Sequence, residues 1–282
     1  MASRIPDGAG IGLRLPHLSE VVATRPDVGW LEIHPENFLA NAHAMELLTE
    51  LSKTYPISVH TVGISVGSAS GIDRLHVKRL RKLVDRIDPF FVSGHLAWST
   101  FGVEYLNDLL PLPLNTETLS LVVRNINEVQ DTLGRCYLVE NPSSYIGFSS
   151  TTMGEAEFLS ELVVRTGCRL LCDVSNAYVS ARNMAYDPYH YIDSFLADAI
   201  AEVHLGGYTP EGNLLIDTHA APIADPAWDL FEYAVRRFGL KPTLIEWDNE
   251  IPSLVTLVNE AARAEAIASG ALQPEEYRAG AS

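Results

Sequence analysis

Short apolar runs alternate with longer amphipathic segments along most of the chain. In the longer segments the apolar residues recur at positions i, i+3, i+4 and i+7, which is the spacing of one face of a helix. The apolar runs span Ile11–Arg14, Gly29–Asn37, Ile57–Gly63, Phe90–Trp98, Cys136–Asn141, Arg169–Asn176, Ile200–Gly207 and Thr243–Asn249. The amphipathic segments span Leu18–Thr24, Ala44–Lys53, Asp73–Ile87, Thr116–Leu133, Glu155–Arg165, Pro188–Leu196, Ala227–Phe238 and Ser253–Ala268. This alternation predicts βαβ units and a parallel sheet, because a crossover between parallel strands needs about a dozen residues or more.

The number of runs decides between two parallel architectures. Eight βα units over roughly 250 residues match a closed (β/α)8 TIM barrel. An open, doubly wound sheet is the alternative, but no run leads into a G-x-G-x-x-G turn or a Walker loop. No linker rich in Pro, Gly or Ser divides the chain. We therefore predict one α/β domain over residues 1–282, with its core at about 10–260 and a loose tail at about 270–282.

The composition is that of a globular protein with a strong negative charge. Hydrophobic residues make up 47% of the chain and charged residues 20%, which provides for a buried core. The formal net charge of −16 disfavours nucleic acid and anionic membranes as partners. No apolar stretch has secretory or membrane-spanning length, so we expect a cytoplasmic protein. The three cysteines, Cys136, Cys168 and Cys172, are expected to be reduced, buried thiols.

The carboxyl ends of the predicted strands carry an unusual number of possible metal ligands. In a barrel of this kind the active site is built at those ends. The residues there are His34, Glu36, Asn37, His60, His95, Glu140, Asn141, Asp173, Asn176, His204, Glu246 and Asp248. A lone histidine such as His60 would more often be a hydrogen-bonded core residue. A whole set converging on one mouth would leave several buried charges uncompensated unless a cation were present, so the set favours metal binding.

One further pair belongs to this mouth. Asp217 and His219 lie in the long loop after the seventh run, and an Asp-x-His spacing in an extended segment projects both side chains to one side. The predicted metal donors are His60, His95, Glu140, Asp173, Asn176, His204, Asp217, His219 and Glu246. Nine donors exceed what one ion uses, so two or three metals are expected, with Glu140 as a possible bridge. Imidazole and carboxylate donors suit iron, manganese or zinc, and the neutral amide of Asn176 would leave its metal more open to substrate or dioxygen. Two carboxylates could also act as general acid and base without metal, but the histidines would then be unexplained.

Several motifs resemble those of the multinuclear non-haem iron-dependent oxidative enzymes, long catalogued as an uncharacterised protein family. The motifs are Glu32-Ile-His-Pro-Glu-Asn37, Ser93-Gly-His-Leu-Ala-Trp-Ser99, Asn107-Asp-Leu-Leu-Pro-Leu-Pro113, Leu138-Val-Glu-Asn-Pro-Ser-Ser144, Cys172-Asp-Val-Ser-Asn176, Ile216-Asp-Thr-His219 and Leu244-Ile-Glu-Trp-Asp-Asn249. The likeness runs from about Gly10 to Asn259, and the family's metal-binding pattern falls on all nine donors.

The resemblance implies a TIM barrel that holds two or three irons, Fe(II) or Fe(III), and uses dioxygen to oxidise cysteine residues of a ribosomally made precursor peptide. Relatives build the oxazolone and thioamide of methanobactin, and others form thiooxazoles in copper-binding bufferins, to whose stand-alone branch the final motif is most similar. Several work with a small partner protein that presents the peptide. Glu140, Asn176 and Asp217 are the residues expected to take part directly in catalysis. Glu36, Asn37, Trp98, Asn141 and Asp248 are candidates for orienting the histidines.

Three other functions stay open. The ligand order also resembles that of endonuclease IV, a TIM barrel with three zincs, although Asn176 stands where that pattern has a histidine and the charge of −16 opposes a DNA substrate. A sugar isomerase like xylose isomerase would need one or two metals and would leave His60, His95 and His219 idle. A module that stores metal or binds peptide without turnover is the non-enzymatic alternative.

Overall fold

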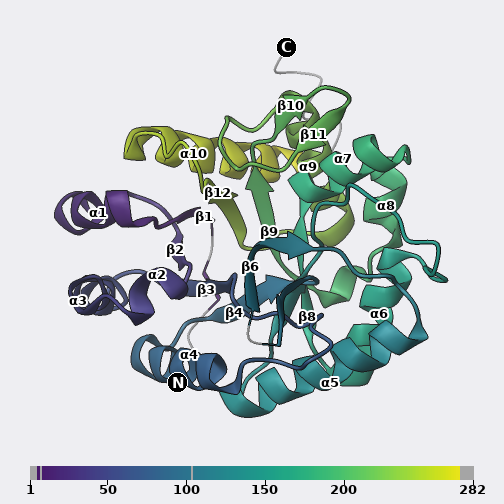
Figure 1. Ribbon diagram of the computed structural model, residues 1–282. Helices are drawn as coiled ribbons and strands as arrows, with labels where there is room; N and C mark the ends of the chain where they lie inside the picture. Colours follow the sequence, from purple (N-terminus) through teal and green to yellow (C-terminus); the bar gives the residue numbers. More distant parts are fainter. Residues whose placement is uncertain (1–4, 7, 103, 274–282) are drawn as a thin grey trace.

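The computed structural model describes residues 5–6, 8–102 and 104–273 and forms a closed parallel barrel ringed by helices (Figure 1). The barrel strands follow the order β1, β12, β9, β8, β7, β4, β3, β2, and β1 pairs with both β12 and β2 to close the ring. Their bounds are β1 Ala9–Gly12, β2 Trp30–Ile33, β3 Ile57–Thr61, β4 Phe91–His95, β7 Leu138–Glu140, β8 Arg169–Asp173, β9 Ile200–Gly206 and β12 Thr243–Glu246. Seven of these strands lie within their predicted apolar runs, and β1 overlaps the first run but begins two residues before it, so the predicted TIM barrel is confirmed.

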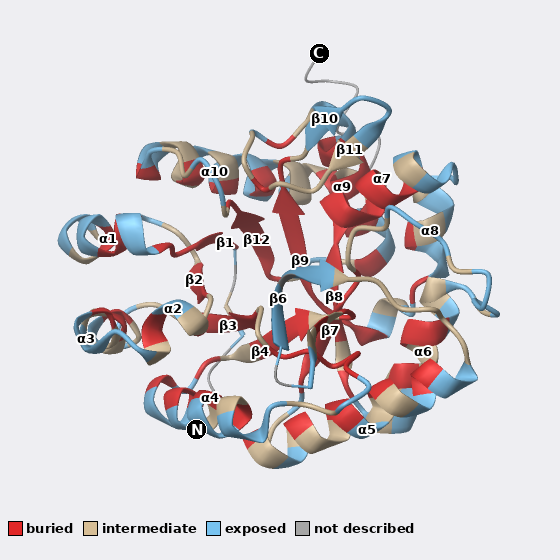
Figure 2. Ribbon diagram, viewed as in Figure 1, coloured by how far each residue is buried: buried red, intermediate tan, exposed pale blue. Residues whose placement is uncertain are grey.

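Helices cover the outside of the barrel. Their bounds are α1 Leu18–Thr24, α2 Glu36–Leu39, α3 Ala42–Leu51, α4 Arg74–Ile87, α5 Thr116–Leu133, α6 Glu155–Thr166, α7 Val174–Met184, α8 Pro188–Ser194, α9 Asp225–Phe238 and α10 Leu254–Ala271, with 3-10 turns at Leu15–His17 and Ala197–Ala199. In α4, for example, the side chain of Asp73 caps the first turn, and Val77, Leu80, Val84 and Ile87 are buried on one face. Figure 2 shows the result, with buried barrel strands in the middle and exposed residues on the outer helix faces.

Two helices were not predicted: the short α2, which begins inside the second apolar run, and α7. The sixth apolar run was expected to stay extended to Asn176, but the strand β8 ends at Asp173 and α7 begins at the next residue. The reason is local: the carboxylate of Asp173 accepts a hydrogen bond from the backbone N–H of Asn176 at 2.7 Å and caps the helix. Asp173 and Asn176 therefore lie at a strand end and in the first turn of a helix.

Two hairpins also escaped prediction. The antiparallel pair β5 Trp98–Phe101 and β6 Glu104–Leu110 follows β4, and the pair β10 Thr209–Glu211 and β11 Leu214–Ile216 follows β9. Both insertions leave from the carboxyl end of a barrel strand. They therefore add to the end of the barrel where the donors were expected, and β6 crosses in front of the barrel in Figure 1.

Three smaller expectations concern single residues and the chain end. Cys168 and Cys172 are buried as predicted, but Cys136 is exposed, because it stands two residues before β7, outside the barrel wall. The loose tail at about 270–282 falls mainly on residues 274–282, which lie outside the described residues, and α10 itself continues to Ala271. Among the described residues no helix is long and apolar enough to cross a membrane.

Candidate metal centre

The barrel register brings the first three donors together. His95 at the end of β4 lies directly beside Glu140 at the end of β7, and His60 comes from the neighbouring strand β3. Oε2 of Glu140 is 3.2 Å from Nε2 of His60 and 3.3 Å from Nε2 of His95, and the two imidazole nitrogens are 3.2 Å apart. The hydroxyl of Ser93, 2.8 Å from Nδ1 of His60, holds the ring with Nε2 toward the carboxylate. These three residues form one group that could hold a metal ion.

A second group shares Glu140 with the first. Glu140, Asp173, His204 and Glu246 each offer a ligand atom, and these atoms lie within 4.8 Å of one another. Asp173 and His204 are register partners on β8 and β9, and Nδ1 of His204 is 2.9 Å from Oε2 of Glu246. Membership of both groups is the geometry that a bridging carboxylate requires, and it supports the bridging role expected for Glu140.

The loop pair Asp217 and His219 reaches the same mouth by a different route from the one expected. The segment is not extended, because His219 has a left-handed backbone with φ 45°. The backbone N–H groups of Asp248 and Asn249 donate to the carbonyl of His219 at 2.8 and 3.1 Å, and Gly206 leaves room for the His219 ring, which a Cβ there would strike. Nε2 of His219 is 2.8 Å from Oδ1 of Asp217.

This loop pair approaches the second group at its edge. Nε2 of His219 lies 3.9 Å from Oδ2 of Asp173. Among the described residues, Asp217 and His219 thus form a close pair beside the donors on the strands. They do not join a group of three or more possible ligands like the two groups above.

Asn176 lies at the centre but its carboxamide is already engaged. Its Nδ2 donates to Oε1 of Glu140 at 3.3 Å and to the carbonyl of Asn141 at 3.2 Å. Its Oδ1 accepts a hydrogen bond from the hydroxyl of Ser143 at 2.7 Å. In this arrangement Asn176 holds Glu140 in place, and its role as a metal ligand stays a prediction.

Several buried donor atoms have no hydrogen-bond partner in the part of the chain that the structure describes. These atoms are Oε2 of Glu140, Oδ2 of Asp173 and Nε2 of His204, whereas Nε2 of His219 and Oδ1 of Asp217 face each other as an ion pair. Buried polar atoms without partners cost free energy, and a cation bound among them would remove that cost. The donor set therefore fits the metals that its chemistry implies.

The protonation of the group reflects its burial. Burial and the nearby His95 hold the pKa of His60 well below its ordinary value, and burial lowers the pKa of His95 to about 4. Burial also raises the pKa of Glu140 well above its usual range and raises that of Asp173 to about 6. Two neutral imidazoles with free lone pairs, beside carboxyl groups that lack a counter-charge, are what a metal site without its ion presents.

The other two histidines behave differently. Burial lowers the pKa of His204, but the carboxylates of Glu32 and Glu246 outweigh it and raise that pKa well above the ordinary value. The pKa of His219 is likewise lowered by burial and raised overall by Asp217 and Glu246. The carboxylates around these two imidazoles thus favour positive charge at this position.

Arg14 was not predicted to belong to the site. It is buried, its Nε donates to Oδ1 of Asp248 at 2.7 Å, and its Nη2 is 3.3 Å from Oε1 of Glu246 and 3.0 Å from Nε2 of His34. His34, Glu246 and Asp248 could by spacing hold an ion, but the guanidinium already supplies the positive charge there. Its position at the end of the first apolar run was the signal that sequence reasoning passed over.

The residues expected to orient the histidines divide into two sets. Asp248 contacts Nδ1 of His219 at 3.2 Å, and Asn141 clamps the backbone of Asp173 through two hydrogen bonds of 2.9 Å. Trp98 instead donates to the carbonyl of Pro111, away from the donors. Asn37 is exposed.

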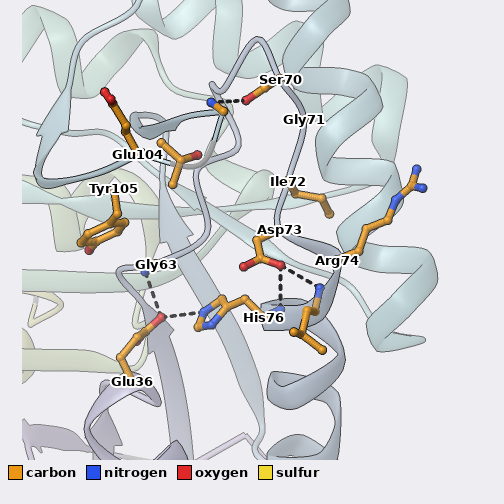
Figure 3. A pocket seen from close by; sticks show the side chains of 13 residues that line it. Glu36, Gly63, Ser70, Gly71, Ile72, Asp73, Arg74, His76, Glu104 and Tyr105 are labelled. Carbon is orange, nitrogen blue, oxygen red and sulfur yellow. Dashed lines mark hydrogen bonds and ion pairs between the residues drawn. The ribbon is translucent and has the colours of Figure 1, made fainter.

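Glu36 lies in a cleft of about 850 Å³ beside the mouth (Figure 3). Its Oε1 accepts the backbone N–H of Gly63 at 2.9 Å and contacts Nε2 of His76 at 3.1 Å. Glu104 and Tyr105 of β6 line the opposite side of the cleft. Glu36 therefore orients His76 of α4, which is not a proposed donor, and shapes the cleft instead of the metal group.

A smaller cavity of about 150 Å³ opens directly onto the donors. It is lined by the donors His95, Asn176, Asp217, His219 and Glu246, together with His34, Val62, Leu109, Thr218, Asp248 and Asn249. Leu109 belongs to β6, and Val62 adjoins Gly63 of the larger cleft. The β5–β6 hairpin thus borders both the donors and the cleft.

Comparison with known proteins gives one family and one fold. Residues 8–269 match the family model described as RiPP precursor modification enzyme MbnB/TglH/ChrH, where RiPP denotes a ribosomally synthesised and post-translationally modified peptide. A UPF0276 protein of Vibrio parahaemolyticus is 44% identical over 270 residues, covering 94% of each chain, and a UPF0276 protein of Chromobacterium violaceum is 44% identical over 267 residues, covering 95% of this chain and 97% of its own.

Solved structures with a similar fold are far more distant in sequence. A D-tagatose 3-epimerase-like protein matches with a TM-score of 0.60 at 16% identity, over 94% of this chain and 97% of its own. A xylose isomerase domain protein from Alicyclobacillus acidocaldarius matches with a TM-score of 0.61 at 11% identity, over 93% of this chain and 99% of its own. Likeness at this level of identity extends to the barrel alone.

Proposed function

We propose, on the premise that the chain belongs to the family of RiPP precursor modification enzymes MbnB/TglH/ChrH, that it is an iron-dependent oxidase acting on cysteine residues of a precursor peptide. The family modifies precursor peptides. The identity of the metals, the use of dioxygen, the cysteine target with a thiooxazole or oxazolone and thioamide product, and a cytoplasmic location are our proposal.

One observation carries the proposal. Two groups of donors share Glu140, and each has buried donor atoms without partners in the described ranges. Imidazole and carboxylate without thiolate is a donor chemistry that suits iron. A third position beside Asp217 and His219 would bring the number of ions from two to three.

The residues of the chain have distinct tasks in this proposal. Glu140 would hold ions of both donor groups, and Asn176 holds that carboxylate in place by donating to its Oε1. Asp248 directs the ring of His219. When bound, iron would supply the electron transfer by which dioxygen oxidises a cysteine side chain.

The surroundings of the site support a peptide as substrate. The cleft of Figure 3 adjoins the small cavity over the donors, and the hairpin between them exposes Phe101, Tyr105, Leu106 and Leu109. Exposed apolar side chains gathered at the rim of a cleft are typical of a surface that binds protein or peptide. We propose that the precursor peptide enters along this hairpin, and that a small partner protein presents it there.

The test starts from protein purified without oxygen. We expect elemental analysis to find more than one iron per chain, since nine donors exceed the need of one ion. With its precursor peptide and dioxygen, the loaded protein should convert the peptide with the loss of mass that accompanies oxidation. A peptide with serine in place of each cysteine and a reaction kept without oxygen are the controls. One zinc and no iron would contradict the proposal, and zinc at all three positions would favour phosphodiester hydrolysis.

A further inference from the structure

A second layer of acidic side chains lies beneath the donors. Glu32 on β2 and Glu202 on β9 are both fully buried in the barrel interior. Within the described ranges none of their four carboxylate oxygens accepts a hydrogen bond. Neither residue belongs to the nine donors. Two buried carboxyl groups without partners are costly, so their position calls for a physical reason.

His204 connects this layer with the metal centre. Its Nδ1 lies 2.9 Å from Oε2 of Glu246, on the side of the donors. Its Nε2, on the other side of the ring, lies 3.4 Å from Oε2 of Glu32 and 3.6 Å from Oε1 of Glu202. The ring is thus held between the donors and two carboxyl groups that approach one nitrogen. Both contacts are longer than the usual hydrogen-bond length, but each brings a carboxylate oxygen to the same nitrogen.

We propose that Glu32 and Glu202 are positioning residues that accept the Nε2–H of His204 and thereby turn its Nδ1 lone pair toward the metals. The inference rests on the proposed function, because it assumes that His204 is a ligand. A ligating histidine usually gives its other ring N–H to a carboxylate or carbonyl, which fixes the tautomer and raises the basicity of the ligating nitrogen. In the described residues, Glu32 and Glu202 are the carboxyl groups that face Nε2 of His204.

A cation bound in the lower layer is the alternative reading of the same residues. Glu32, His60 and His204 could by spacing surround an ion. His60, however, lies 3.2 Å from both Glu140 and His95 through the same Nε2 atom, so it is committed to the upper group. Without His60, the lower layer offers only the carboxyl groups of Glu32 and Glu202 and Nε2 of His204. The other ring nitrogen of His204, Nδ1, faces the metal centre. This geometry favours an acceptor pair.

The test uses the full chain loaded with Co(II), a paramagnetic ion that accepts the same donors. Proton NMR in water then shows shifted, exchangeable imidazole N–H signals from ligating histidines, and the signal lost in His204→Gln identifies that residue. The variants are Glu32→Gln, Glu202→Gln and the double variant. Glu155→Gln is the matched control, because it removes a half-buried carboxylate on α6 whose partner is Tyr191 and not the metal centre.

We expect the double variant to bind Co(II) about 10- to 100-fold more weakly, as for other residues that support a metal ligand. Its His204 N–H should exchange faster with water, whereas the control should keep both affinity and signal. If the double variant does not fold by circular dichroism, the single variants and the His204 signal of the unmutated protein still decide the matter.

Three outcomes would overturn the inference in distinguishable ways. Unchanged affinity and exchange in the double variant would show that the pair does not position His204. Loss of one equivalent of Co(II), with no His204 N–H signal even in the unmutated protein, would show a cation in the lower layer. No shifted histidine signals in any sample would instead overturn the proposed metal centre itself.

Discussion

The two ends of the barrel interior are filled by opposite kinds of side chain. Toward the amino ends of the strands, Leu138 on β7, Ala201 on β9 and Phe91 on β4 pack together, and Leu171 from the middle of β8 joins them. Toward the carboxyl ends, imidazole and carboxyl groups from β3, β4, β7, β8, β9 and β12 converge, several of them without partners. The apolar end lowers the free energy of the fold by burial, whereas the polar end raises it until a cation binds. Stability and chemistry are therefore assigned to different ends of the same strands.

The largest effect expected is the loss of activity in Glu140→Ala. The variant removes the carboxylate shared by both donor groups, yet Leu138, two residues earlier on β7, keeps the strand packed. We expect no detectable peptide oxidation together with an unchanged circular dichroism spectrum and near-normal thermal stability. Full activity would refute the bridging role.

The opposite variant, Leu138→Ala, tests the apolar end. Leu138 is the first residue of β7 and is buried, and such a truncation lowers the free energy of unfolding by about 2–5 kcal/mol. The melting temperature should fall, while iron per folded chain and the rate of peptide oxidation at low temperature stay close to those of the unmutated protein. A large loss of iron from the folded variant would mean that the two ends are not separable.

Asn176→His should have a smaller effect on the reaction. The imidazole would add a strong ligand where the neutral amide now holds Glu140, so metal retention against a chelator should rise. Peptide oxidation should fall about 10-fold or more, because a coordination position is filled and Glu140 loses its hydrogen bond. Unchanged oxidation would leave Asn176 as a hydrogen-bonding residue beside Asp173.

The smallest effect expected is on the pH dependence of the free energy of unfolding, through Glu155, which lies outside the metal centre. Burial raises the pKa of Glu155 to about 7, above its value in the unfolded chain. The folded state therefore holds this proton more tightly, and stability from this group is greatest below about pH 4 and lost as the pH rises through 7. Denaturant unfolding should show the unmutated protein losing stability relative to Glu155→Gln between pH 5 and pH 8. Parallel curves would contradict this assignment.

The sequence was most informative where a pattern repeats. The strands and most helices follow from hydrophobic spacing, and the donors follow from the rule that barrel sites form at strand ends. The helix α7 does not follow from the apolar run, because the Asp173–Asn176 spacing suits both the end of a strand and a helix cap. The short hairpins carry too few residues for a periodic signal.

The lower layer was missed for a different reason. Glu32 and Glu202 do not stand at strand ends, but Glu32-Ile-His34 and Glu202-Val-His204 each place a glutamate two residues before a histidine. Alternate residues of a strand point to the same face, so these glutamates had to face the barrel interior as well. Glu202 lies on the same strand as His204, but the contact of Glu32 with His204 depends on the barrel closing from β2 through β1 and β12 to β9, which no local pattern encodes.

The loop position of Asp217 and His219 has a consequence for how the centre assembles. The other proposed donors lie on strands or in the first turn of α7, whereas this pair follows the β10–β11 hairpin. Ordering a loop costs conformational entropy that a strand has already lost on folding. Metals held only by strand donors would load first, and the ion that needs the loop would load last and leave first. The number of ions bound would then depend on the metal concentration. Occupancy of the position that needs the loop would respond most strongly to that concentration.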